Sequence, residues 1–200
     1  KALTNGTMNR SKRTSGGVVM KKFEEKTIQS QPIYSGKVIS LKVDDVSLPN
    51  GETGKREIIN HPGAVAVIAI TENNKILLVE QYRKALERSI IEIPAGKLEK
   101  GEEPIVTARR ELEEETGYTS DHFEFVQAFA TSPGFADEII HIYVVEKLKK
   151  LDIPVDLDED EFVELMEVSL EEAEAMVAAG RIYDAKTAFA ILWLKLKMNI

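Results

Sequence analysis

The 200-residue chain contains no cysteine. That absence excludes disulfide bonds and thiolate metal sites, and it agrees with a reducing compartment, so we expect a cytoplasmic protein. No apolar run approaches the length that spans a bilayer, and the first residues lack the apolar stretch of a signal peptide. The sequence therefore predicts no membrane partner.

Acidic residues outnumber basic residues, with 34 Asp and Glu against 26 Lys and Arg. The formal net charge is −8. A nucleic-acid backbone would repel such a chain, so we expect no nucleic-acid partner. Clustered carboxylates would instead attract divalent cations. Residues 1–19 are basic, contain no acid and show no hydrophobic period. We interpret them as an added leader or a disordered arm.

Most of the chain has the pattern of strands. Alternating or apolar runs predict strands near 39–43, 55–61, 64–70, 76–82, 90–93, 123–130 and 139–146, and a short one after the acidic loop 156–161. Residues 64–70 are almost all apolar, as in a strand buried on both faces. Residues 20–58 hold a few strands with too little core to stand alone, so they need surface from the body or from a second subunit.

Three helices are predicted. The first covers 104–116, with Pro104 in its first turn and Gly117 just past its end. Ser169 and Glu172 form the capping-box signature of a second. The third begins at Asp184, and we expect it to pack through Phe189, Leu192, Trp193 and Leu196. This order of elements predicts an α/β or α+β sandwich.

The first helix carries three carboxylates at i, i+3 and i+4. Glu111, Glu114 and Glu115 share one helix face, where like charges repel. A hard divalent cation would compensate, since Mg²⁺ prefers oxygen ligands. Arg110 can pin one carboxylate through a bidentate pair. The alternative interpretation is a solvated acidic face.

A longer pattern surrounds these carboxylates and resembles the Nudix box, G-x5-E-x7-R-E-U-x-E-E-x-G-U, in which U is a bulky apolar residue. The matching residues are Gly96, Glu102, Arg110, Glu111, Leu112, Glu114, Glu115, Gly117 and Tyr118. Because seven identities recur at fixed spacing, a chance match is improbable. The resemblance implies a Nudix α/β/α sandwich with a mixed sheet, in which the box forms a loop, a helix and a loop.

The same resemblance implies a metal centre. Glu111, Glu114, Glu115 and the carbonyl of Ala95 would ligate Mg²⁺, with Mn²⁺ as the alternative and two or more ions per site. Arg110 would orient the carboxylates, and we count it with Glu115 among the catalytic residues.

The flanks of the box resemble the ADP-ribose pyrophosphatase branch of the family, especially its members from bacilli. Pro133 follows the box by fifteen residues, and the runs 80–83 and 92–96 precede it. The strands of 20–58 resemble the branch's extra domain, which is exchanged between the subunits of a homodimer. We therefore predict a dimerisation unit over 20–58 and a catalytic domain over 59–200.

Residues on these flanks are candidates for substrate binding. An arginine can bind a diphosphate through bidentate hydrogen bonds. Arg83 is therefore a candidate for binding the diphosphate, and Arg56 is a weaker candidate. Tyr34 would stack on an adenine from the partner subunit, or it belongs to the core. Glu138 is a metal-linked carboxylate or a strand-end acid. Pro133 and Gly134 complete the set, although the pair is also an ordinary turn.

The implied reaction is attack of water on the adenosyl phosphorus of ADP-ribose, which gives AMP and ribose 5-phosphate. In this branch the general base lies in a loop before the final strand, which points to Glu159, with Glu161 as its rival. A merely solvated loop is the other interpretation. The alternatives in function are hydrolysis of another nucleoside diphosphate derivative, such as a sugar nucleotide or a dinucleoside polyphosphate, and a module that binds ADP-ribose without cutting it.

Overall fold

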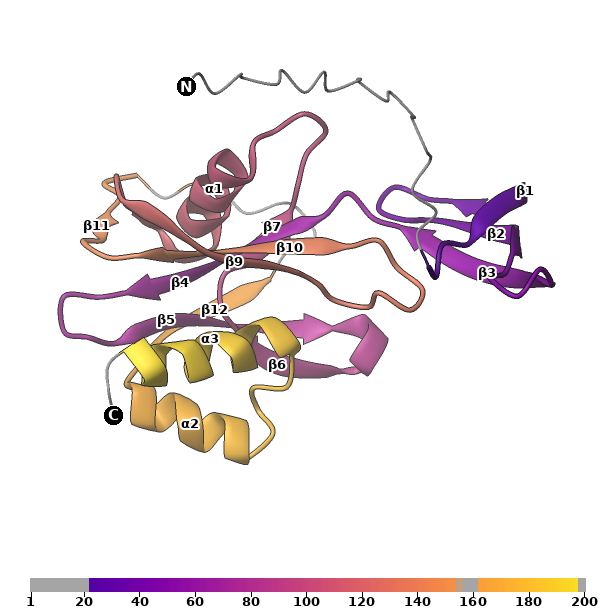
Figure 1. Ribbon diagram of the computed structural model, residues 1–200. Coiled ribbons are helices and arrows are strands. Elements are labelled where there is room, and N and C mark those ends of the chain that lie inside the picture. The colour runs from indigo at the N-terminus through magenta and orange to yellow at the C-terminus, as the bar shows by residue number, and fades with distance from the viewer. Residues whose placement is uncertain (1–21, 154, 156–161, 198–200) are drawn as a thin grey trace, which may run out of the picture.

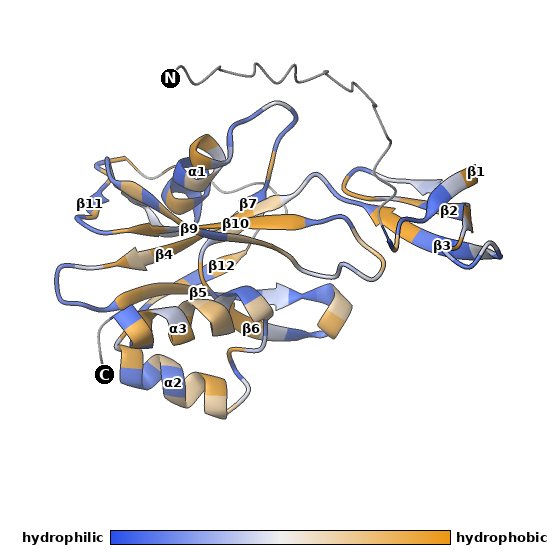
Figure 2. Ribbon diagram, in the orientation of Figure 1, coloured by the Kyte–Doolittle hydropathy of each residue, from blue (hydrophilic) through white to orange (hydrophobic). Residues whose placement is uncertain are grey.

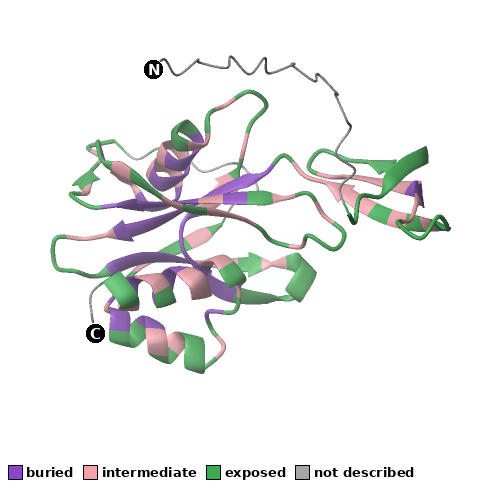
Figure 3. Ribbon diagram, viewed as in Figure 1, coloured by how far each residue is buried: buried purple, intermediate pink, exposed green. Residues whose placement is uncertain are grey.

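The structure is a computed structural model that describes residues 22–153, 155 and 162–197 (Figure 1). Its first part is a three-stranded antiparallel sheet in the order β1-β2-β3, formed by β1 (Lys26–Ser35), β2 (Ser40–Ser47) and β3 (Thr53–Asn60). Figure 3 shows that this sheet projects from the body and that much of it is exposed. Every residue of β1 is exposed, and Val46 is the buried apolar residue of β2. The N-terminal sheet thus has almost no core of its own.

The body is built on a seven-stranded mixed sheet. Its main path is β12-β5-β4-β10-β9, while β6 pairs with β5 and β7 pairs with β4. The strands are β4 (Ala64–Ile70), β5 (Ile76–Arg83), β6 (Arg88–Glu92), β7 (Ala95–Lys97), β9 (Phe123–Ala130), β10 (Ile139–Val145) and β12 (Val163–Val168). Of the described strands of this sheet, β4 and β10 pair in parallel and the other pairs are antiparallel. A one-turn helix, η1 (Lys84–Leu86), joins β5 to β6, and β8 (Tyr118–Thr119) pairs with β11 (Lys149–Lys150).

Helices cover both faces of this sheet (Figure 1). α1 (Pro104–Thr116) lies on one face, and α2 (Leu170–Ala178) and α3 (Ala185–Lys197) lie on the other. Alternate residues of β4 point to opposite sides: Val65 and Val67 pack with α1, whereas Ala66 and Ile68 pack with α2 and α3. The central strands are accordingly hydrophobic along most of their length (Figure 2). The α/β/α sandwich with a mixed sheet and a small N-terminal sheet is confirmed.

The helix ends are those that the sequence predicts. Pro104 stands in the first turn of α1, and Gly117 ends it with a left-handed φ of 68°. At α2 both bonds of the capping box are present, between Ser169 and Glu172. The Ser169 N–H donates to the Glu172 carboxylate, and this bond contributes most to lowering the pKa of that carboxyl, because it favours the charged form.

The predicted packing of α3 is partly wrong. Leu192 and Leu196 are 64% and 79% exposed. The buried stripe of the helix instead consists of Thr187, Ala190, Ile191 and Leu194, with Phe189 and Trp193 packed beside it. Because α3 is apolar around most of its circumference, hydrophobic spacing alone does not identify its inner face. Among the described residues, no helix is long and apolar enough to cross a bilayer.

Candidate active site

The acidic residues of α1 are packed against strand β7. Glu111 and Glu115 are buried, at 5% and 6% exposure. The Ala95 N–H donates to Glu115 Oε2 at 3.0 Å. At Gly96 the backbone approaches so closely that a Cβ would stand 1.9 Å from Glu111 Cδ. Glycine is therefore required at this position because the Glu111 carboxylate occupies the space of a side chain.

Arg110 joins the acidic residues of the motif. Its Nη1 lies 2.8 Å from Glu111 Oε1 and 2.9 Å from Glu114 Oε2, and its Nη2 lies 3.7 Å from Glu102 Oε2. Thr107 Oγ1 donates to the same Glu102 oxygen at 2.7 Å. Burial alone would lower the pKa of the Arg110 guanidinium, but the charges of Glu111 and Glu114 outweigh it and raise the pKa above its usual value. The arrangement lets one guanidinium hold two carboxylates of the predicted metal set.

The donor chemistry of this helix face fits a hard divalent cation. Glu111, Glu114 and Glu115 share one face of the helix, and the backbone of β7 is held beside them. Within the part of the chain that the structure describes, however, no three acidic or histidine side chains converge as a ready metal cage. Arg110 instead neutralises Glu111 and Glu114.

A cavity of ≈ 540 Å³ opens beside β7, which is within the usual range for small-ligand sites, about 300–1,000 Å³. It brings together three residues of the predicted site, Arg83, Ala95 and Glu138, and Gly96 of the motif also lines it. Strands, loops and the first turn of α3 supply further polar residues that sequence reasoning missed, namely His61, Gln81, Lys97, Thr131, Ser132, Asp184 and Lys186. These residues are scattered along the chain, and no local pattern relates them.

Arg83 stands at the end of β5 with its side chain 40% exposed. Its Nε donates to Glu92 Oε2 at 2.6 Å, and Glu92 is nearly fully buried. Its two terminal nitrogens bond to none of the described residues. The guanidinium is thus fixed on one side and available on the other, as bidentate recognition of an anion needs.

Glu138 lies on another wall of the cavity. It accepts a hydrogen bond from Thr131 Oγ1, and its Oε1 lies 3.5 Å from His61 Nδ1. His61 Nδ1 also accepts a bond from the Gly63 N–H at 3.1 Å. That bond places the proton of a neutral His61 on Nε2.

Pro133 and Gly134 form a turn beside the cavity. The N–H groups of Phe135 and Ala136 both donate to the carbonyl of Ser132, at 3.1 and 2.9 Å. Neither Pro133 nor Gly134 lines the cavity, whereas the preceding Ser132 does. In this chain the two residues shape the loop and do not form the wall.

Two other predicted residues lie away from the cavity, on the N-terminal sheet. Arg56 pairs with Glu25 through Nε at 2.8 Å and Nη2 at 2.5 Å. Tyr34 is 58% exposed and lies over Gly36. The other two candidates, Glu159 and Glu161, lie outside the described residues.

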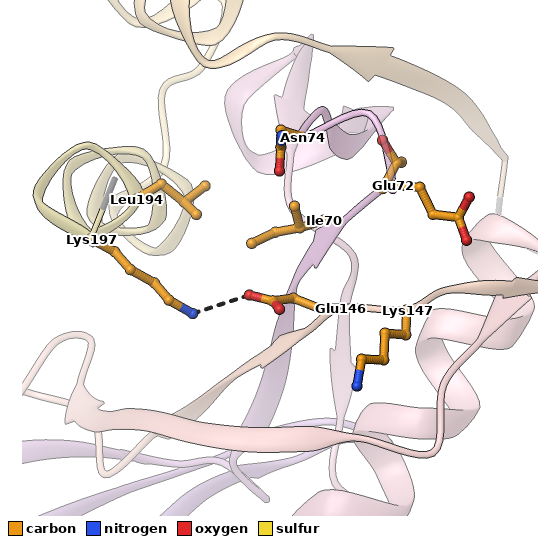
Figure 4. A pocket seen from close by; sticks show the side chains of 8 residues that line it. Ile70, Glu72, Asn74, Glu146, Lys147, Leu194 and Lys197 are labelled. Carbon is orange, nitrogen blue, oxygen red and sulfur yellow. Dashed lines mark hydrogen bonds and ion pairs between the residues drawn. The ribbon is translucent and has the colours of Figure 1, made fainter. Parts of the chain in front are cut away.

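A second hollow, of ≈ 420 Å³, lies elsewhere on the body (Figure 4). Its wall consists of Ile70, Thr71, Glu72, Asn74, Glu146, Lys147, Leu194 and Lys197. Lys197 Nζ and Glu146 Oε1 lie 3.3 Å apart in it. The cavity beside β7 is the better candidate, because its wall includes Ala95 and Gly96, which lie against Glu115 and Glu111 of α1.

The chain belongs to the Nudix family of hydrolases. The family model of the NUDIX domain matches residues 60–188, and that of the nucleoside diphosphate sugar hydrolase N-terminal domain matches residues 25–59. The motif on α1 and the α/β/α sandwich agree with this assignment.

Individual relatives show which Nudix hydrolases the chain resembles. The chain is 62% identical over 178 residues to an ADP-ribose pyrophosphatase of Bacillus subtilis, a match that covers 89% of this chain and 96% of that protein. It is 63% identical over 177 residues to a methanol dehydrogenase activator of Bacillus methanolicus, with coverage of 88% and 96%. A solved structure of an ADP compounds hydrolase superposes with a TM-score of 0.77 at 18% identity, over 88% of this chain and 97% of that one. At that identity the superposition supports the fold alone.

Proposed function

We propose that the protein hydrolyses the pyrophosphate bond of ADP-ribose, giving AMP and ribose 5-phosphate. The observation that carries this proposal is the 62% identity, along nearly the whole chain, to an ADP-ribose pyrophosphatase. The cavity beside the acidic face of α1 supports it, because its size suits a nucleotide and its wall includes Arg83.

The metal of this reaction would be Mg²⁺ or Mn²⁺, with two or more ions held by Glu111, Glu114, Glu115 and the Ala95 carbonyl. Bound metal neutralises the charge of a diphosphate and lowers the pKa of a coordinated water. Two features of the chain support this ligand set. Gly96 leaves room for the Glu111 carboxylate, and the Ala95 N–H fixes Glu115.

Other residues would bind the substrate and move the proton. Arg83 offers two terminal nitrogens to the diphosphate, while Arg110 holds Glu111 and Glu114 at a fixed separation. Glu138 would border the bound nucleotide, and the turn at Pro133 and Gly134 would hold Ser132 at the cavity wall. Glu159 or Glu161 would accept the proton of the attacking water.

We further propose a cytoplasmic homodimer in which residues 20–58 form the dimerisation unit. The exposed β1 and the near absence of a core in the N-terminal sheet support this arrangement, because such a sheet gains by covering its apolar side chains. In the dimer, Arg56 and Tyr34 would reach the partner's cavity. Light scattering on the purified protein gives the oligomeric state directly, and a monomer at micromolar concentration would contradict the dimer.

The activity is tested by incubating the protein and Mg²⁺ with ADP-ribose, GDP-mannose, a dinucleoside polyphosphate and NADH, and by identifying the products. We expect ADP-ribose to have the highest kcat/KM and to yield AMP and ribose 5-phosphate. The Glu115→Gln variant, assayed in parallel, reports any contaminating hydrolase. A clear preference for another compound would replace this function with the alternative, hydrolysis of a different nucleoside diphosphate derivative.

Relatives support that alternative to a lesser degree. GDP-mannose pyrophosphatases of Yersinia enterocolitica and Cronobacter sakazakii are 33% identical to this chain. A module that binds ADP-ribose without turnover is disfavoured, because every glutamate of the motif is retained. The likeness to a methanol dehydrogenase activator suggests one further measurement: the rate of an NAD-dependent alcohol dehydrogenase with and without this protein.

A further inference from the structure

Glu92 is a buried carboxylate outside the metal motif, and it holds two cations of the cavity wall. Its side chain is 4% exposed at the end of β6. Oε2 accepts the bond from Arg83 Nε at 2.6 Å, and Oε1 accepts a bond from Lys186 Nζ. A buried carboxylate is tolerated only when charge and hydrogen bonds compensate it. Here each oxygen has its own cation, one from β5 and one from α3.

Lys186 is itself locked in place. Its side chain is 12% exposed, and Nζ also bonds to Asp184 Oδ1 at 2.9 Å. The same Asp184 oxygen accepts the Thr187 N–H at 3.1 Å, which ties the group to the start of α3. Two of the three N–H donors of this ammonium are used on carboxylates, which holds Lys186 in place, and its bond to Glu92 links it to Arg83.

We propose that Lys186 and Glu92 are positioning residues that aim Arg83 at the diphosphate; this rests on the proposed function. Because Lys186 occupies Oε1 of Glu92, Arg83 pairs with Glu92 through Nε alone and keeps both terminal nitrogens for the substrate. Without Lys186, the uncompensated Glu92 would bind Arg83 more fully and would compete with the diphosphate for its terminal nitrogens.

The kinetic test is a double-mutant cycle between Lys186→Met and Arg83→Ala, with kcat/KM for ADP-ribose as the readout. In the wild-type background, Lys186→Met should lower kcat/KM about tenfold or more. A displacement of about 1 Å in a binding group can lower the rate about 10²-fold. In the Arg83→Ala background the same change should have less than about a twofold effect, because the group that it positions is gone. Equal losses in both backgrounds would overturn the proposal.

Two further variants serve as controls for the double-mutant cycle. Lys186→Arg keeps a cation beside Glu92 and should restore most of the activity. Lys195→Met is the matched control, because Lys195 lies on the same helix and pairs with Glu174 at 2.5 Å, away from the cavity. It should leave kcat/KM unchanged. If Lys186→Met does not fold, Glu92→Gln combined with Lys186→Met keeps the charge balanced, and its loss should also vanish in the Arg83→Ala background.

A readout without turnover separates this proposal from the proposed function. The side-chain Nε–H signal of Arg83 in a ¹⁵N NMR spectrum is identified by its disappearance in Arg83→Ala. That signal should shift in Lys186→Met and stay in place in Lys195→Met, whichever compound the enzyme cuts. An unmoved Arg83 signal in Lys186→Met would overturn the positioning role even if activity fell. Absence of ADP-ribose hydrolysis by the wild type would contradict only the substrate.

Discussion

Gly96 and Glu111 lie in such close contact that a methyl group on Gly96 would stand 1.9 Å from the carboxylate carbon of Glu111. The glycine at the start of the motif and the glutamate fifteen residues later thus form one packed unit. This contact explains why a residue without chemistry of its own has a fixed place in the Nudix motif.

Replacement of Gly96 by alanine should therefore damage the proposed metal site. The added Cβ must displace the Glu111 carboxylate, and displacing groups around a metal typically costs about 10–100-fold in affinity or activity. We expect kcat/KM to fall by at least about tenfold and the Mg²⁺ concentration for half-maximal activity to rise. Gly54→Ala is the control, because nothing lies closer than 3.4 Å to a Cβ there. Equal activities of the two variants would contradict the role given to Gly96.

The Glu115→Gln variant distinguishes the role of the Glu115 charge from that of its hydrogen bond with Ala95. The amide oxygen of glutamine can still accept the Ala95 N–H, so the fold and the melting temperature should change little. The negative charge is lost, and activity at saturating Mg²⁺ should fall by about 10² or more, at or above the upper end of losses seen for outer-shell partners. Calorimetric titration with Mn²⁺ should show weaker binding. Wild-type Mn²⁺ affinity in this variant would remove Glu115 from the ligand set.

The proposed general base is tested at two positions in parallel. Glu159→Gln and Glu161→Gln should be assayed at saturating Mg²⁺ and ADP-ribose. A positioned acid–base group contributes about 10²–10⁴ in rate, so we expect one of the two variants to lose activity in that range and the other to lose little. Losses below about tenfold in both variants would exclude a base in this loop.

The hydrogen-bonded carboxylate of Asp137 should make a pH-dependent contribution to the stability of the fold. Its carboxylate accepts bonds from Asn60 Nδ2 at 2.7 Å and from the His61 N–H at 2.8 Å. The bond from Asn60 contributes most to holding the pKa of Asp137 below its ordinary value of 3.8. A pKa lowered in the folded state gives stability that is present above pH 3.8 and is lost as the pH falls through the folded-state pKa.

The measurement is the melting temperature of wild type and Asp137→Asn from neutral to strongly acidic pH. We expect the variant to melt a few degrees lower at neutral pH, and the difference to shrink below pH 3.8. Asp45→Asn, at a surface ion pair of the N-terminal sheet, serves as the control. A difference that stays constant down to the lowest pH would show that the Asp137 charge is not the cause.

Much of the fold was predictable because its signals are local. Pro104 and Gly117 bound α1, and Ser169 with Glu172 caps α2, since these effects act within one helical turn. The unbroken apolar run 64–70 correctly indicated a strand covered on both faces. The face of α3 was not predictable, because an almost entirely apolar helix carries no periodic signal and its neighbours decide which side is buried.

The candidate site, like the fold, was predictable from the sequence only in part. The spacing of Glu111, Glu114 and Glu115 by itself placed three carboxylates on one helix face, because helix geometry is fixed by the backbone. Only the tertiary structure brought Lys186 to Glu92, 94 residues away, and Glu92 to Arg83. Such contacts depend on how α3 packs on the sheet, and the chain between these residues carries no pattern that sets their distance. The sequence therefore determined the helix with three carboxylates on one face, and the packing of the helices on the sheet decided which charged residues line the cavity beside β7.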